Sequence, residues 1–205
     1  ALGRNALGTI TTPSENTALG NMAMQASTTG YDCVAVGSNA LYTNTTGYRN
    51  VAVGKDALYS NTTGTLNTAV GMDALKDNQT GGQNAALGYK ALENNTTNNN
   101  TAIGAYAASL TTGGGSNTAV GQAALYTNTT GAQNTAIGLK SLYLATTGNN
   151  NSAVGFNASY NITTGYSNTS LGAQALFTIT TAAHNVAIGN DALKLSTADN
   201  CVAVG

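Results

Sequence analysis

One short phrase recurs along the whole chain: an alanine, an aliphatic residue and a glycine. It occurs thirteen times, and of the twelve intervals between successive glycines ten are 17 residues long and two are 16. Ser170 replaces the alanine once, and the next residue is always Val, Ile or Leu. The glycines are Gly3, Gly20, Gly37, Gly54, Gly71, Gly88, Gly104, Gly121, Gly138, Gly155, Gly172, Gly189 and Gly205. Such a period is typical of repeat architectures, whose stacked units share one continuous core.

Residues 117–133 show the usual unit, Asn-Thr-Ala-Val-Gly-Gln-Ala-Ala-Leu-Tyr-Thr-Asn-Thr-Thr-Gly-Ala-Gln. It contains two short apolar segments, Asn-Thr-Ala-Val and Ala-Leu-Tyr. A helix would need apolar residues at helical spacing over about ten positions, and the glycine and the Thr-Thr-Gly step interrupt every such run. In the first unit Pro13 replaces the second glycine, which marks that place as a turn. We therefore predict an all-β fold, a parallel β-solenoid whose coils each hold two short strands and two turns.

The repeat leaves no room for a separate domain. We expect residues 1–205 to form a single array of about twelve coils. Both ends of the sequence lie in mid-repeat, and neither shows the atypical unit that caps a repeat array. The chain is therefore expected to be a fragment of a longer fibre.

Stacking places equivalent residues of successive coils in straight columns. Stacked asparagine amides can hydrogen-bond from layer to layer at strand spacing. In an extended strand, the alanine of Thr-Ala-Val points to one face and its neighbours to the other. We expect the aliphatic residues to be buried and the alanine face to stay uncovered, so that other copies of the chain, three around an axis, pack against it. The ladder residues are Asn50, Asn67, Asn117 and Asn134, with Ala52, Ala69, Ala119 and Ala136.

Composition excludes several partners. Charged residues make up 7% of the chain and its net charge is −1, whereas ordinary domains carry about 25% charged residues. The chain therefore lacks the basic surface that nucleic acids or acidic membranes require. It also has no run of about 20 apolar residues, so we expect no membrane insertion by this segment.

The two cysteines, Cys33 and Cys201, both occupy the asparagine column. Ten layers separate them, which is roughly 48 Å at about 4.8 Å per layer and excludes a disulfide within one chain. Two unreactive thiols in a packed ladder are the simplest interpretation. A bond between neighbouring chains stays open.

These repeats resemble those of fibrous adhesive proteins. Val51-Ala52-Val53-Gly54 and Val186-Ala187-Ile188-Gly189 match the Val-Ala-Ile-Gly type of step in the head repeats of trimeric autotransporter adhesins. The longer Asn-Thr-Ala-Val-Gly-x-x-Ala-Leu-Tyr-x-Asn-Thr-Thr-Gly form is similar to repeats of phage and phage-like tail fibres. The resemblance implies a left-handed parallel β-roll in a homotrimer, acting as the head or shaft of an adhesive fibre. Adhesin head repeats are usually shorter than this unit.

The sequence contains no pattern typical of catalysis. His184 is the single histidine, and no second ligand type repeats near it at metal-binding spacing. Asp56 and Asp73 share a slot in adjacent coils, but other coils carry Asn, Lys or Ala there, so we expect solvated side chains. We predict that the chain is not an enzyme and has no catalytic residues, metal or cofactor.

One column is a candidate recognition surface. The residue after Ala-Leu is often aromatic, and such rings could lie against sugar rings while Asn and Thr side chains bond the sugar hydroxyls. The alternative is that neighbouring rings pack on one another. The threonine columns raise a third hypothesis, an ice-binding surface. The candidate glycan-binding residues are Tyr42, Tyr59, Tyr126, Tyr143 and Tyr160, with Phe177 next in the column.

The sequence therefore predicts a structural fibre segment, located outside the cell, on a cell surface or on a virion. It would give reach and attachment to a surface glycan or receptor, with copies of itself as partners. The alternative is a monomeric ice-binding or carbohydrate-binding solenoid.

Overall fold

The computed structural model describes residues 1–9, 11 and 15–205. Within these residues every named element is a β-strand, and the chain divides into two compact units, unit 1 (Ala1–Asn100) and unit 2 (Thr101–Gly205). Pro13, for which we predicted a turn, lies outside the described residues. The strands of unit 1 are β1 (Thr17–Leu19), β2 (Val34–Val36), β3 (Val51–Val53), β4 (Thr68–Val70) and β5 (Ala85–Leu87). Those of unit 2 are β6 (Thr101–Ile103), β7 (Thr118–Val120), β8 (Thr135–Ile137), β9 (Ser152–Val154), β10 (Thr169–Leu171), β11 (Val186–Ile188) and β12 (Val202–Val204).

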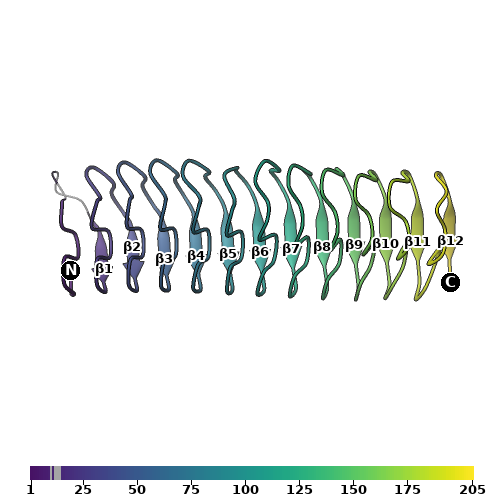
Figure 1. Ribbon diagram of the computed structural model, residues 1–205, viewed down its shortest axis with the longest axis horizontal. Coiled ribbons are helices and arrows are strands. Elements are labelled where there is room, and N and C mark those ends of the chain that lie inside the picture. The colour runs from purple at the N-terminus through teal and green to yellow at the C-terminus, as the bar shows by residue number, and fades with distance from the viewer. Residues whose placement is uncertain (10, 12–14) are drawn as a thin grey trace. The chain divides into compact units, whose positions relative to one another are not determined.

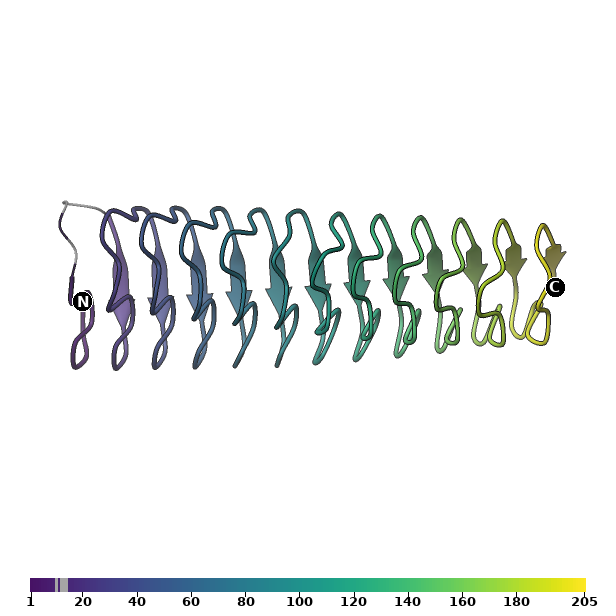
Figure 2. The same ribbon diagram turned by 45° about the horizontal axis from the view of Figure 1, so that its top comes forward.

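Each unit is a parallel β-solenoid. Successive strands within a unit lie side by side, point the same way and pair in register (Figure 1 and Figure 2). Ala52 pairs with Ala69 in unit 1, and Ala119 pairs with Ala136 in unit 2. The shorter coil that leads to β12 keeps this register, since Val186 pairs with Val202. The predicted parallel solenoid with one repeat per coil is confirmed.

The second predicted strand is wrong, because each coil contains one strand. The Ala-Leu-Tyr segment forms turns in which every second residue has left-handed backbone, for example Asp56 and Leu58 with φ of 56° and 51°. Such backbone costs about 1–2 kcal/mol per non-glycine residue. Hydrogen bonds between coils offset this cost, since the Asp56 backbone N–H donates to the Ser38 carbonyl and the Leu58 N–H donates to the Ala74 carbonyl, both at 3.0 Å.

The burial of the two strand faces is the reverse of our expectation. The alanines Ala52, Ala69, Ala119 and Ala136 are fully buried inside their own coils. The residues on either side of each alanine point outward, and the aliphatic ones among them are half-buried or exposed. The coil interior is narrow and already holds the buried leucine of the Ala-Leu step, such as Leu58 or Leu125, so a methyl group fills the remaining space.

The glycine after each strand is required by close contact between coils. Gly121 has a φ of +131°, and a Cβ added there would lie 2.5 Å from the carbonyl oxygen of Gly138 in the next coil. Equivalent contacts recur at Gly54 and Gly71 in unit 1. A side chain at this place would therefore separate adjacent coils.

We predict that Gly121→Ala destabilises the chain by at least about 2 kcal/mol, because it combines forbidden backbone with a backbone clash. Gly113→Ala is the matched control, since the nearest atom there is the Thr130 methyl group at 3.1 Å. Urea unfolding followed by circular dichroism measures both. Equal losses for the two variants would contradict the role of the close contact.

Candidate functional site

The asparagine column is buried and hydrogen-bonded along its length. In unit 1, the Asn67 backbone N–H donates to Asn50 Oδ1 at 2.9 Å, and the Asn84 N–H donates to Asn67 Oδ1 at 3.0 Å. Asn67 Nδ2 donates to the Gly81 carbonyl at 2.8 Å. In unit 2, Asn134 makes the same bonds to Asn117 and to Gly148. The side chains of Asn67 and Asn134 therefore each bind the backbone of the next coil at two points.

Cys33 occupies this column in unit 1 and makes weaker contacts. Its Sγ accepts the Asn50 N–H at 3.5 Å, where an amide oxygen would accept it at about 2.9 Å. Burial raises the pKa of the Cys33 thiol above its ordinary value. Cys33 and Cys201 are both free thiols. Cys33 is therefore a neutral, buried group with a structural role.

The described residues offer no metal or catalytic cluster. Within residues 1–9, 11 and 15–205, no three His, Cys, Asp or Glu side chains gather closely enough to hold a metal ion. His184 is exposed and meets the Tyr166 ring edge-on. The same part of the chain contains no helix that could cross a membrane.

The two aligned aspartates are held by ion pairs, and the expectation of solvated side chains is wrong for Asp73. Asp73 is buried and pairs with Lys76 at 3.2 Å, which raises the pKa of the Lys76 ammonium. Asp56 is half-buried and accepts a hydrogen bond from Asn39 Nδ2 at 2.9 Å. Asp56 also lies 3.8 Å from the Lys55 ammonium. Each carboxylate therefore has a lysine as its counter-ion, which indicates a structural role for both aspartates.

The aromatic column consists of stacked rings. In unit 1, Tyr42 and Tyr59 lie parallel, with centroids 5.1 Å apart. In unit 2, the centroid distances of the stacked pairs from Tyr126 through Tyr143 and Tyr160 to Phe177 are 5.1–5.4 Å. Inside a stack, neighbouring rings cover each other's faces. Broad contact with sugar faces therefore requires a place where the stack ends.

The threonine pair after the Ala-Leu-Tyr segment is divided between structure and surface. The hydroxyl of the first threonine donates to the next coil, as from Thr45 to the Thr62 carbonyl at 2.9 Å and from Thr129 to the Thr146 carbonyl at 3.0 Å. The second threonine of each of these pairs is exposed. Half of the hydroxyls in the proposed ice-binding array are thus committed to holding coils together.

The outer strand face is a regular apolar surface of each unit. It is built from the first and third strand residues, which are Thr, Ser, Ala, Val, Leu or Ile throughout. The exposed fractions of Leu19 and Leu87 in unit 1 are 44% and 49%, and those of Ile103, Ile137, Leu171 and Ile188 in unit 2 are 37–48%. We call this surface the aliphatic ladder.

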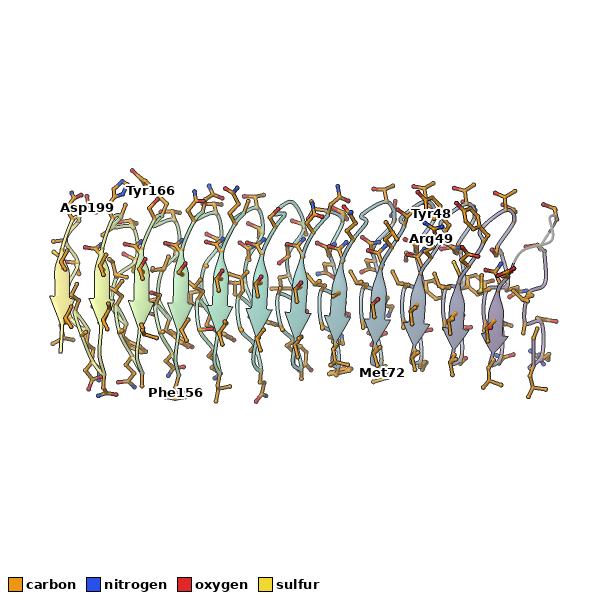
Figure 3. The ribbon with its side chains drawn as sticks, turned by 180° about the vertical axis from the view of Figure 1, so that it is seen from behind. Tyr48, Arg49, Met72, Phe156, Tyr166 and Asp199 are labelled. Carbon is orange, nitrogen blue, oxygen red and sulfur yellow. The ribbon has the colours of Figure 1, made fainter. Side chains whose placement is uncertain are left out.

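The two edges of the coils carry different residues. In unit 1, Tyr48 and Arg49 lie at one edge and Met72 at the other (Figure 3). In unit 2, Tyr166 and Asp199 lie at the loop edge and Phe156 at the opposite edge (Figure 3). The aliphatic ladder runs between these edges. None of the strand residues that form it is charged.

Comparison with known proteins gives no relative. No family model matches the chain, and no curated protein or solved structure is significantly similar to it. The resemblance to fibre repeats therefore depends on the repeat residues alone.

We predict that Asn67→Ala costs about 2–4 kcal/mol, because it leaves the buried Asn84 N–H unsatisfied and removes the bond to Gly81. The control is Asn21→Ala, a change of the same chemistry at an exposed turn residue. Thermal unfolding with both variants measures the difference. A loss from Asn67→Ala no larger than that of the control would show that the ladder contributes no stability.

Cys33→Asn should stabilise the chain by about 1 kcal/mol, since an amide oxygen then accepts the Asn50 N–H at normal length. It should also remove a pH dependence. Because the folded-state pKa of Cys33 is raised, its contribution is complete below the ordinary thiol pKa of about 8.5 and is lost as pH rises toward the folded-state pKa. Melting temperatures at pH 7 and pH 10 should diverge more for the unmodified chain than for the variant. Parallel curves would contradict the assignment.

Proposed function

We propose that this chain is a structural fibre segment that gives reach and surface attachment as a homotrimer of left-handed β-rolls. It acts outside the cell, on a cell surface or on a virion. The observation that carries the proposal is the aliphatic ladder, which repeats in every coil of each unit and is not covered by the chain itself.

The ladder supports self-association because soluble chains rarely leave a regular apolar surface open to water. In unit 1, β2 and β3 each place two valines outward, and in unit 2, β6 to β8 place threonines and larger aliphatic residues outward. Contiguous exposed apolar patches are typical of interaction sites. The absence of charge on these strands favours an apolar partner over a polyelectrolyte.

The repeat selects a copy of this chain as that partner. The outward side chains recur at the layer spacing of a parallel sheet, about 4.8 Å. A second copy has the same spacing in every coil, so its side chains can interdigitate along the full length of a unit. If the copies are related by a closed rotation axis, every ladder faces that axis and no apolar surface stays open. Three copies whose sheets face one axis meet this condition.

The mechanical part of the proposal is supported by the bonds along each unit. Every coil is joined to the next by strand pairing, by the turn amides and by the asparagine column. Pulling a unit apart along its axis therefore loads many hydrogen bonds in parallel. A rod of this kind suits a spacer that holds an attachment site away from its base.

We predict that the intact chain has three times its 20.5 kDa mass in solution, by light scattering during size exclusion. The double variant Val53→Lys, Ile137→Lys should weaken association by at least about 100-fold, because it places charges in both apolar contacts. Thr147→Lys, at an exposed loop residue, is the control and should keep the trimer mass. A monomeric unmodified chain, or an unchanged mass in the double variant, would overturn the proposal.

A further inference from the structure

A small pocket opens where the aromatic stack of unit 2 begins. Its volume is about 280 Å³, and its lining residues are Tyr106, Ala123, Tyr126, Lys140 and Tyr143. None of them belongs to a strand, so the pocket does not use the aliphatic ladder. A volume just below the roughly 300 Å³ at which drug-sized sites begin suits one sugar-sized ring.

The pocket exists because one column contains a small residue between two large ones. The slot two residues after the strand glycine carries Tyr106, Ala123 and Lys140 in three successive coils. In the other coils with this slot, the residue is Asn5, Met22, Asn39, Asp56, Asp73, Lys90, Asn157, Gln174 or Asp191. Two layers separate Tyr106 from Lys140, about 9.6 Å at strand spacing. The alanine therefore leaves a gap one layer high.

The walls of the gap are aromatic. Tyr126 and Tyr143 are stacked, with centroids 5.4 Å apart. Tyr106 meets Tyr126 nearly at right angles, with centroids 6.2 Å apart and an interplanar angle of 79°. The preceding column residue is Ser109, which is too small to continue the stack. The aromatic stack thus ends at this pocket, where the C–H groups of a sugar ring can contact aromatic surface.

The pocket is also lined by a lysine that has no carboxylate partner. The Lys140 ammonium lies 5.5 Å from the centroid of the Tyr143 ring and is exposed. Lys55, Lys76, Lys90 and Lys194 each have a carboxylate partner at 2.9–3.8 Å. Among the described residues, Lys140 is the one lysine without a carboxylate within 4.0 Å, and no acidic side chain lines the pocket. The Lys140 ammonium is therefore accessible to an anionic group.

We propose that this pocket binds one carboxylate-bearing sugar residue of a surface polysaccharide. The sugar ring occupies the gap over Ala123 against the tyrosine rings, and its carboxylate pairs with the Lys140 ammonium. The proposal goes beyond the mechanical role, because it assigns a ligand class to one place on an otherwise repetitive surface. It does not require the trimer, since all five lining residues lie in one unit of one chain.

Binding of methyl glucuronide and of methyl glucoside to the full chain, measured by ligand-observed NMR titration, tests this proposal. The glucuronide should bind about fivefold more tightly, because the two probes differ in the carboxylate. Lys140→Gln should abolish that preference and leave weak binding of the glucoside. Lys55→Gln, which removes a paired lysine outside the pocket, should change neither.

Ala123→Gln should abolish binding of both sugars by filling the gap. The variant is compatible with the local backbone, because Gln174 adopts a φ of 55° in the same slot of another coil. Asn157→Gln is the matched control in that slot and should bind as the unmodified chain does. Absence of glucuronide binding, equal affinity for both sugars, or binding unaffected by Ala123→Gln would each overturn the proposal. Light scattering on the same samples reports the trimer separately, so the two proposals fail independently.

Discussion

The spacing of hydrogen-bonded parallel strands constrains every other feature of this chain. Because each coil lies one strand spacing from the next, a buried side chain has its equivalents directly above and below it. Asn67 can bind the backbone of the following coil because the Asn84 N–H and the Gly81 carbonyl recur at the right height. The same spacing leaves no room for a Cβ at Gly121. Identity between repeats is thus a packing requirement of the stack.

The period was enough to predict the solenoid, one repeat per coil and the alternation of the strand. It could not assign the faces. Thr-Ala-Val presents two slightly apolar faces, and transfer scales favour burying the valine over the alanine. The structure buries Ala119 because the interior is already occupied by Leu125, and that crowding depends on the turn between them. The second predicted strand failed for a related reason, since left-handed backbone at a leucine is rare and has no signal in composition.

The candidate site was predictable in part. The tyrosine column follows from the sequence, while the mutual covering of ring faces depends on ring orientation, which a repeat pattern does not determine. The pocket follows from an irregularity. An alignment of the repeats places Ala123 between Tyr106 and Lys140. The alignment does not show that Tyr126 lies beside the resulting gap, and the pocket depends on that contact. In a repetitive chain, the exceptions to the pattern are the places where specific recognition can arise.

The asparagine column is directional, since side chains such as Asn67 and Asn117 accept a hydrogen bond from the coil that follows and donate one to it. Every repeat thus presents complementary groups on its two sides, and an added or deleted repeat inside a unit would join its neighbours with no buried amide left over. Tandem duplication in the gene could then alter the length of a unit by one coil at a time, with no change in the sequences of the neighbouring repeats.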